Sequence, residues 1–218
     1  MNEQKIRKNK EVLALIRKGN DNLGAMGYTD HSEAHAAMVA DRAAYILKKL
    51  DYTEKDIELV KIAGWMHDIG NAINRTHHAE YGALLANDIL KETDMSMEDR
   101  ITVVSAIGHH DESTGGATDP VSAALIIADK TDVRRSRVRE KNEATFDKHD
   151  RVNYAVMDAK LKIDTEKHVI ALNLQIDTKI CTMYEYFEIF LGRMMMCRGA
   201  ADVLGMTFKL TANGSKVL

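Results

Sequence analysis

Histidine and aspartate side chains at wide separations along this chain are the groups best suited to bind a metal ion. His35, the adjacent pair His67 and Asp68, and Asp129 all lie in or beside apolar segments. Neutral imidazole and ionised carboxylate are common ligands of divalent metals at neutral pH. A metal held by such groups lowers the pKa of a bound water and polarises a phosphoryl oxygen. The expected chemistry is therefore metal-assisted hydrolysis.

The pair His67 and Asp68 carries most of this hypothesis, because it follows the apolar run KIAGWM. Two adjacent polar groups at the buried end of a helix are costly unless they are paired or bind a metal. Asp129 follows the apolar run ALIIA, and the simpler alternative there is a salt bridge to Arg134 or another nearby base. A single histidine near a helix end, such as His35, is more often a cap or a surface group, so its role depends on the neighbouring pair.

Helix-start signals place these residues on helices. The predicted N-caps are Asp30, Thr53, Thr76, Ser96 and Asp119. Asp30 with Glu33 reads as a capping box for a helix to about Leu50, and Asp119 is followed by a proline at the first helical position. One proline in 218 residues leaves little to break helices, so a mostly α protein is expected.

From about Asn142 the pattern changes. The segments AVMDAKLKID and KHVIALNLQID alternate apolar and polar residues and predict an antiparallel β-hairpin. A long helix is predicted from Lys179 to Leu204, and MTFKLTANG could add a third strand. The predicted organisation is a helical domain over residues 1–140, followed by a small α+β element over residues 141–218.

The order of the four candidate ligands, H…HD…D, resembles that of the HD-domain metal-dependent phosphohydrolases. Three blocks carry the resemblance: HAAMVADRA, AGWMHDIG and ALIIADKTD. They span roughly residues 30 to 135. The resemblance implies an HD-type helical bundle in which His35, His67, Asp68 and Asp129 hold a divalent metal. His35 is preferred to His31 because the family ligand precedes the valine, here Val39, by four positions.

Further histidines suggest a second metal. In dinuclear members of this family, histidines between the HD pair and the last aspartate hold it. The block HHAEYGALL resembles the family's H-x-E-x-G stretch and points to His78, and AIGHHDE resembles its paired-histidine helix end, His109 and His110. The resemblance thus implies one or two divalent transition metals per chain (Fe, Mn, Co, Ni or Zn), with Asp68 as a bridge. The alternative is that these histidines only contact substrate phosphate.

Transition-state charge on a phosphoryl group calls for cationic help. Lys130 and Asp132 follow Asp129 directly, and the resemblance places them near the site. Arg75 lies beside the histidine-rich turn, and Arg135 lies in a basic run that could equally be a solvated helix end. The expected catalytic residues are Asp68, His78, Lys130 and Asp132. The expected phosphate contacts are Arg75, His109, His110 and Arg135.

The expected activity is hydrolysis of a phosphomonoester, phosphodiester or phosphoanhydride bond, with a nucleotide as the expected small-molecule substrate. The stretch DESTGGATDPV lacks the G-Y-P triplet of HD-GYP phosphodiesterases, and this argues against hydrolysis of cyclic-di-GMP. Two alternatives stay open. One is a di-iron oxygenase with a similar ligand set, and the other is a metal-stabilised regulatory domain without catalysis.

Composition limits the other classes of function. A net charge of −3 argues against a surface that coats nucleic acid, and the longest apolar stretch, Val121 to Ala128, is too short to span a bilayer. The charged start does not resemble a signal peptide. Cys181 and Cys197 suggest no disulfide framework, so the cytoplasm is the expected compartment. The apolar C-terminal helix makes a homodimer reasonable.

Overall fold

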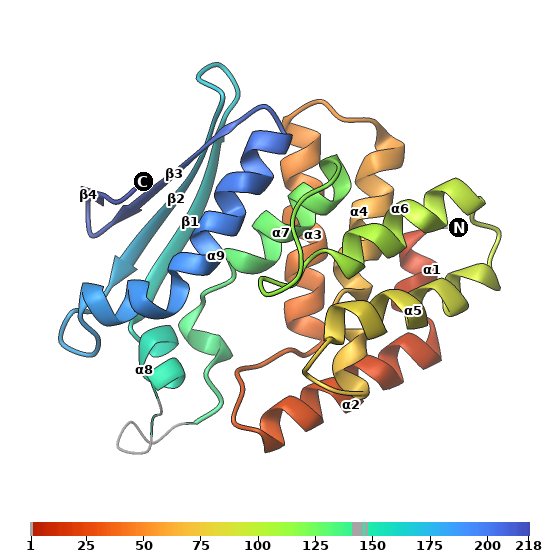
Figure 1. Ribbon diagram of the computed structural model, residues 1–218, viewed down its shortest axis with the longest axis horizontal. Coiled ribbons are helices and arrows are strands. Elements are labelled where there is room, and N and C mark those ends of the chain that lie inside the picture. Colours follow the sequence, from red (N-terminus) through yellow and green to blue (C-terminus); the bar gives the residue numbers. More distant parts are fainter. Residues whose placement is uncertain (1, 141–145, 147) are drawn as a thin grey trace.

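The computed structural model describes residues 2–140, 146 and 148–218. Helices α1 to α7 form one side of the molecule, and a four-stranded sheet with helix α9 forms the other (Figure 1). Within the described residues, no helix is both long and apolar enough to cross a bilayer. The predicted class, a mostly helical bundle with a small C-terminal α+β element, is confirmed.

The helical side contains seven α-helices and a short 3-10 helix, η1, in the described part of the chain. Their bounds are α1 (Glu3–Arg7), α2 (Lys10–Ala25), α3 (Glu33–Lys49), α4 (Glu54–Met66), η1 (Ile69–Ala72), α5 (His78–Lys91), α6 (Met97–Gly108) and α7 (Pro120–Lys130). Helix α7 is buried along almost its whole length, as expected for the central helix of a bundle.

The predicted helix starts at Thr53, Ser96 and Asp119 are confirmed, because each side chain accepts a hydrogen bond from a backbone N–H of the first turn. The N-cap of α3 is Ser32 and not Asp30. Asp30 instead accepts a hydrogen bond from the Ser32 hydroxyl, at 2.7 Å, so it supports the cap from outside the helix.

The predicted cap at Thr76 is wrong. Helix α5 starts after His77, whose backbone is left-handed at φ 61° and whose side chain makes no capping bond. The turn before α5 is fixed instead by the Asn74 side chain, which accepts a hydrogen bond from the Thr76 N–H at 2.9 Å. An asparagine two residues before the bonded N–H forms a local turn that competes with a helix cap.

The C-terminal side contains two pairs of consecutive strands, each preceded by a helix. Its elements are α8 (Lys148–Tyr154), β1 (Val156–Asp164), β2 (Val169–Ile176), α9 (Met183–Val203), β3 (Thr207–Ala212) and β4 (Ser215–Lys216). Strands β1 and β2 form the predicted antiparallel hairpin, and β3 joins β2 in parallel after the long helix. The predicted domain boundary falls between residues 140 and 141. Residue 141 lies outside the described residues.

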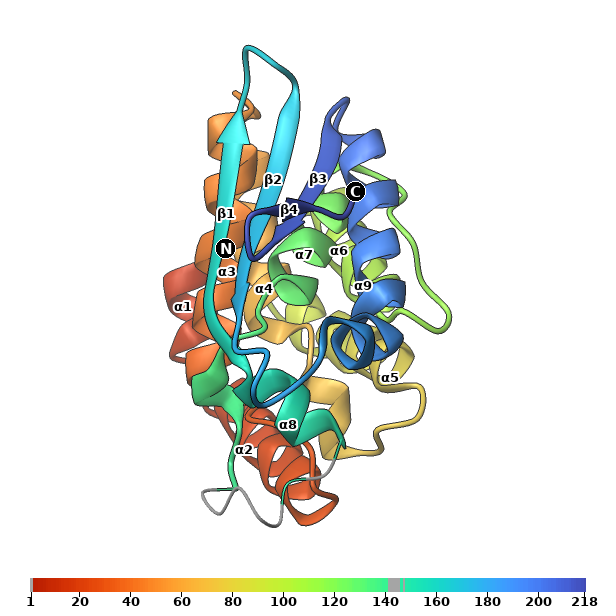
Figure 2. The ribbon, with the colours of Figure 1, turned by 90° about the vertical axis from the view of Figure 1, so that its left-hand side faces the viewer.

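Helix α9 ties the two sides together. It packs against α7 and against β3, and Figure 2 shows β3 beside α9. Its buried face carries Tyr186, Phe190, Met194 and Cys197, which are spaced three or four residues apart. These side chains belong to the same apolar cluster as the cores of α3, α4 and α7. The predicted α+β element is therefore packed onto the helical body through one continuous core.

The backbones of helices α3 and α4 lie very close together at Gly64. A Cβ atom on Gly64 would lie 2.7 Å from the Ala40 Cα and 2.8 Å from the Ala40 N, both backbone atoms of α3. Only glycine fits this crossing without moving one helix. Because Gly64 also accepts a hydrogen bond from His67 Nδ1 at 2.8 Å, this contact helps to set the position of His67.

We expect Gly64→Ala to lower the free energy of unfolding by about 1–3 kcal/mol, the usual cost of overpacking a core. Gly192→Ala is the matched control, because a Cβ on this exposed residue of α9 meets nothing within 4 Å. Its higher helix propensity should leave stability unchanged or raise it by about 0.5–1 kcal/mol. Denaturant unfolding of both variants measures the difference, and equal stabilities would contradict the close approach.

Candidate metal centre

Five helical segments end or begin at one buried point, and each brings a histidine or an aspartate to it. His35 lies on α3, His67 and Asp68 follow α4, His78 begins α5, His110 follows α6, and Asp129 lies in the last turn of α7. All four histidines are at most 3% exposed. The structure thus brings together His35, His67, Asp68 and Asp129, the four ligands predicted first, with His78 and His110, two of the histidines predicted for a second metal.

One half of the cluster contains His35, His67 and Asp129 with one oxygen of Asp68. His35 Nε2 lies 3.3 Å from Asp129 Oδ1, and His67 Nε2 lies 3.2 Å from Asp68 Oδ2. Two ligand atoms that share an ion at about 2.0–2.2 Å are about 3–3.5 Å apart. The ligand atoms of His35, His67 and Asp129 all lie within 4.8 Å of one another, so this half can hold a metal after a small inward movement.

The other half contains His78 and His110 with the second oxygen of Asp68. Asp68 Oδ1 lies 3.6 Å from His78 Nε2 and 3.8 Å from His110 Nε2. The two Nε2 atoms of this histidine pair are 3.2 Å apart. Asp68 therefore presents one carboxylate oxygen to each half of the cluster.

The tautomer of each histidine is fixed from behind by a hydrogen bond at Nδ1. The partners of Nδ1 are Asp132 Oδ2 for His35 (2.8 Å), Gly64 O for His67 (2.8 Å), Arg75 O for His78 (3.1 Å) and Ile107 O for His110 (2.6 Å). A carbonyl or carboxylate oxygen can only accept, so each Nδ1 must carry the hydrogen. When such a ring is neutral, its Nε2 lone pair faces the centre.

Converging lone pairs in a buried place require a cation. His35 Nε2 and His67 Nε2 are buried and have no hydrogen-bond partner among the described residues. His78 Nε2, which lies 3.3 Å from the donor Arg75 Nη1, also faces His110 Nε2 at 3.2 Å as a second acceptor. Such an arrangement is unfavourable unless a proton or a metal lies between the nitrogens. The donor set therefore fits divalent transition metals, which favour imidazole and carboxylate.

The ionisation of the cluster matches this interpretation. Burial opposes ionisation of Asp68, but the neighbouring imidazoles of His67 and His110 outweigh it and hold the pKa of this carboxyl well below its usual value. The charge of Lys130 likewise outweighs burial and lowers the pKa of Asp129. Burial and the neighbouring His110 lower the pKa of His78 to about 4. At neutral pH both carboxylates are ionised and His78 is neutral, as metal ligation requires.

Two further residues hold ligands in place. Asp132, which is 1% exposed, accepts the His35 Nδ1 hydrogen bond and pairs with Arg134 at 2.5 Å. Asn71 donates to Asp68 Oδ1 at 2.8 Å. Asp132 therefore lies behind His35, away from the cavity. Its position is that of a residue that orients a ligand, not of the catalytic residue that the sequence predicted.

A polar cavity opens onto the cluster. Its lining residues are Thr29, His31, Asp68, Arg75, His78, His110, Asp129, Lys130, Arg137 and Arg193. Lys130 Nζ pairs with Asp129 Oδ2 at 2.8 Å, so Lys130, and not Arg134, is the ion-pair partner of this aspartate. Lys130 and Arg75 thus lie at the cavity as predicted.

Sequence reasoning did not assign Arg137, Arg193 or Asp111 to the site. Arg137 was visible only as part of a basic run. Arg193 gave no signal, because it lies on α9, far along the chain from every ligand. Asp111 directly follows His110, and its Oδ1 lies 3.8 Å from His78 Nε2. An acidic residue after the histidine pair was the one signal that could have pointed to it.

The structure does not bring His109 or Arg135 to the cavity, so the roles predicted for them are not supported. His109 lines a separate groove between α5 and α6, and its Nδ1 donates to Ser105 O at 2.9 Å. Adjacent residues at a helix end point in different directions, and only His110 faces inward. Arg135 donates from Nε to Tyr154 O and its guanidinium lies 4.5 Å from the centre of the Tyr154 ring. Instead of continuing α7, the chain turns here into a short 3-10 helix, η2 (Arg135–Arg137).

We expect Asp132→Asn to weaken divalent-metal binding by about 10–100-fold, because the variant lacks the charge that orients His35 and raises its basicity. Calorimetric titration of the metal-free protein with Mn²⁺ or Zn²⁺ measures the affinity. Asp158→Asn, on the partly exposed strand β1 where Asp158 pairs with Lys160, is the control and should bind as the wild type does. Unchanged affinity in Asp132→Asn would show that this contact does not support the ligand.

Comparison with known proteins agrees with this geometry. The family model described as HD domain matches residues 33–143, a segment that includes all six cluster residues. A protein from Methanocaldococcus jannaschii named "Uncharacterized protein MJ1020" is 30% identical over 155 residues, which cover 61% of this chain and 59% of that protein. The chain therefore spans about three fifths of this relative. On the family match and on the ligand cluster, this chain belongs to the HD domain family.

Proposed function

We propose that this protein is a metal-dependent phosphohydrolase that acts on a small phosphorylated molecule, with a nucleotide as the expected substrate. The observation that carries the proposal is a ligand cluster that opens into a cavity lined by Arg75, Lys130, Arg137 and Arg193. When bound, the metal supplies a water of lowered pKa and polarises a phosphoryl oxygen. The family match supports this class of chemistry.

Two metals per chain are the stoichiometry that the ligand geometry favours. The Asp68 carboxylate faces His35 and His67 with Oδ2, and it faces His78 and His110 with Oδ1. A carboxylate placed in this way can bridge two ions, and each half then has its own histidine pair. The set of four imidazoles and two carboxylates suits Fe, Mn, Co, Ni or Zn.

The cations around the cluster give the cavity its preference for anions. Lys130 is 6% exposed and Arg137 is 5% exposed, so their charges are poorly screened by water. Arg75 Nη1 lies 3.3 Å from His78 Nε2, and the guanidinium lies 5.4 Å from the centre of the Tyr28 ring. Arginine held by an aromatic ring keeps its planar fork ready for two oxygens of a phosphate. In this environment the residues bind and orient the phosphoryl group and stabilise the negative charge that develops on it.

The same four cations favour phosphate chemistry over the two alternatives. A di-iron oxygenase could use a similar set of ligands, but an uncharged diol substrate would make no use of the cationic lining of the cavity. A purely regulatory domain needs no complete ligand set beside an accessible polar cavity. Phosphomonoesters, phosphodiesters and phosphoanhydrides all remain candidate substrates, because each presents phosphoryl oxygens to the cavity.

We expect two equivalents of metal in the wild type and about one in His110→Ala, since this change removes a ligand from one half of the cluster only. His109→Ala is the matched control. It alters the adjacent histidine, which lies outside the cavity, and should keep two equivalents. Elemental analysis after reconstitution with Mn²⁺ and removal of free metal measures the stoichiometry. Loss of one equivalent in both variants, or in neither, would contradict the dinuclear assignment.

We expect Asp68→Ala to lose metal and to lower turnover by more than about 1,000-fold, because this residue faces both halves of the cluster. The assay is phosphate release by metal-loaded protein from nucleoside mono-, di- and triphosphates and from a phosphodiester. Wild-type turnover that survives in Asp68→Ala would place the active site elsewhere. Metal-dependent thermal stabilisation without turnover on any substrate would favour the regulatory alternative, and oxygen uptake by the iron-loaded protein would favour the oxygenase.

A further inference from the structure

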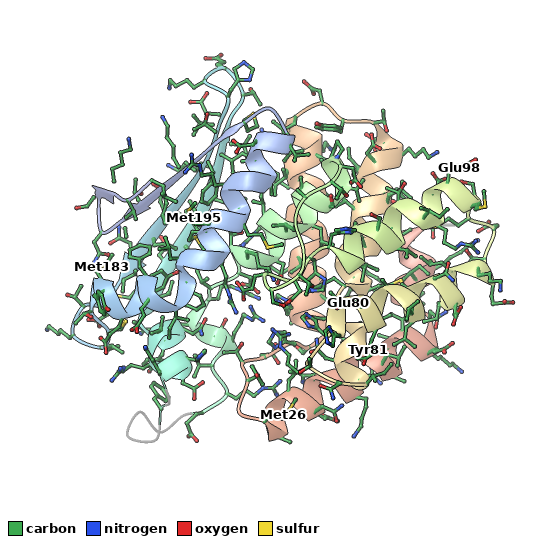
Figure 3. All side chains as sticks on the ribbon, viewed as in Figure 1. Met26, Glu80, Tyr81, Glu98, Met183 and Met195 are labelled. Carbon is green, nitrogen blue, oxygen red and sulfur yellow. The ribbon has the colours of Figure 1, made fainter. Side chains whose placement is uncertain are left out.

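Helix α9 brings a cation of the C-terminal element into the wall of the metal cavity. Arg193 lines the same cavity as Asp68 and Asp129. It lies outside residues 33–143, the part of the chain that matches the HD domain. Figure 3 labels Met195 on this helix and Glu80 at the start of α5. The site is thus larger than the matched segment.

The Arg193 side chain is held at one edge and open at the other. Its Nε donates to Glu112 Oε1 at 3.1 Å, and its guanidinium lies 4.7 Å from the centre of the Phe190 ring. Neither Nη atom has a hydrogen-bond partner in the part of the chain that the structure describes. The two nitrogens that form the planar fork of arginine are therefore free to bind two oxygens of one anion.

The partner of Arg193 lies on the loop that follows the metal ligand His110. The Gly115 N–H donates to Asp111 O at 2.8 Å and the Gly116 N–H donates to His109 O at 3.0 Å, so the loop is folded back on itself. The Arg193 and Glu112 side chains are 28% and 32% exposed. A partly exposed ion pair is weak, so a more highly charged anion in the cavity can compete with Glu112.

A second arginine lies in the same cavity wall. Arg137 is 5% exposed, and it donates from Nε to Asp30 O at 2.9 Å and from Nη1 to Asp132 O at 2.8 Å. These acceptors are neutral carbonyls, so its charge is only partly offset, by the Asp132 carboxylate at 3.7 Å. Burial lowers the pKa of Arg137, the carboxylates of Asp132 and Asp129 oppose this shift, and the nearby charge of Arg193 adds to it. Two like charges that face one cavity are stabilised by an anion bound between them.

We propose that Arg193, supported by Arg137, binds a phosphate group of the substrate, so that the C-terminal element determines part of the substrate specificity. The choice of phosphate as the anion rests on the proposed function. On substrate binding, Arg193 keeps its position on α9, and its Nη atoms donate to the phosphate oxygens. The Glu112 carboxylate orients the empty site and is the group with which the substrate competes.

The test is direct binding of inorganic phosphate to the metal-loaded protein, measured by calorimetry, which needs no turnover. We expect Arg193→Ala to weaken phosphate binding by about 10–100-fold, the size of a lost charge-assisted hydrogen-bond pair. Arg193→Lys should retain part of the affinity because it keeps the charge but not the fork. Arg198→Ala, an exposed residue on the same helix, is the matched control and should bind as the wild type does.

Glu112→Gln separates ligand binding from a structural role. It removes the competing carboxylate, so phosphate should bind as tightly as in the wild type or several-fold more tightly. Weaker binding in Glu112→Gln, or equal binding in Arg193→Ala and the wild type at equal metal content and melting temperature, would overturn the proposal. Wild-type protein that binds phosphate through Arg193 but hydrolyses no substrate would refute the proposed function alone. Wild-type protein that binds no phosphate would overturn the proposal for Arg193, while phosphate release from a substrate by the same protein would leave the proposed function standing.

Discussion

Four histidine lone pairs and two ionised carboxylates converge on one buried point, and the rest of the structure serves to hold them there. Each Nδ1 atom donates to an oxygen behind its ring, so Nε2 is the nitrogen that each ring turns toward the centre and can offer to a metal. Without a cation this arrangement is costly in a buried site. Metal binding should therefore contribute directly to the stability of the helical bundle, because the folded state presents a preformed set of ligands.

Close backbone packing makes this convergence possible. Gly64 allows α4 to lie against the backbone of α3, which brings His67 toward His35. Gly70 plays the same part between η1 and α5, because a Cβ there would lie 2.0 Å from His78 O and 2.5 Å from Gly82 N. At both contacts the smallest residue sets the distance between two ligand-bearing segments. The positions of the ligands thus follow from helix packing more than from local loop structure.

The C-terminal element and the helical side share one apolar core, so the stability of each depends on the other. Helix α9 shares a continuous apolar core with α3, α4 and α7, and it adds Arg193 to the cavity. Destabilising the sheet or α9 should therefore disturb the cavity wall even where no ligand is changed. The element also offers a physical way in which proteins with the same ligand set can differ in substrate, since it lies outside the matched HD segment.

The sequence alone predicted the helical class and the C-terminal hairpin and helix, because caps and periodicity act within a few turns of helix. Polar residues beside apolar runs, together with the resemblance to the HD-domain family, pointed to His35, His67, Asp68 and Asp129 as candidate ligands. Tertiary structure alone decided that His110 and not His109 faces the centre, that Asp132 stands behind His35, and that Arg193 replaces Arg135 at the cavity. The direction of a side chain at a helix end, and contacts between segments far apart in the chain, depend on packing between helices. No short-range pattern in the sequence encodes that packing.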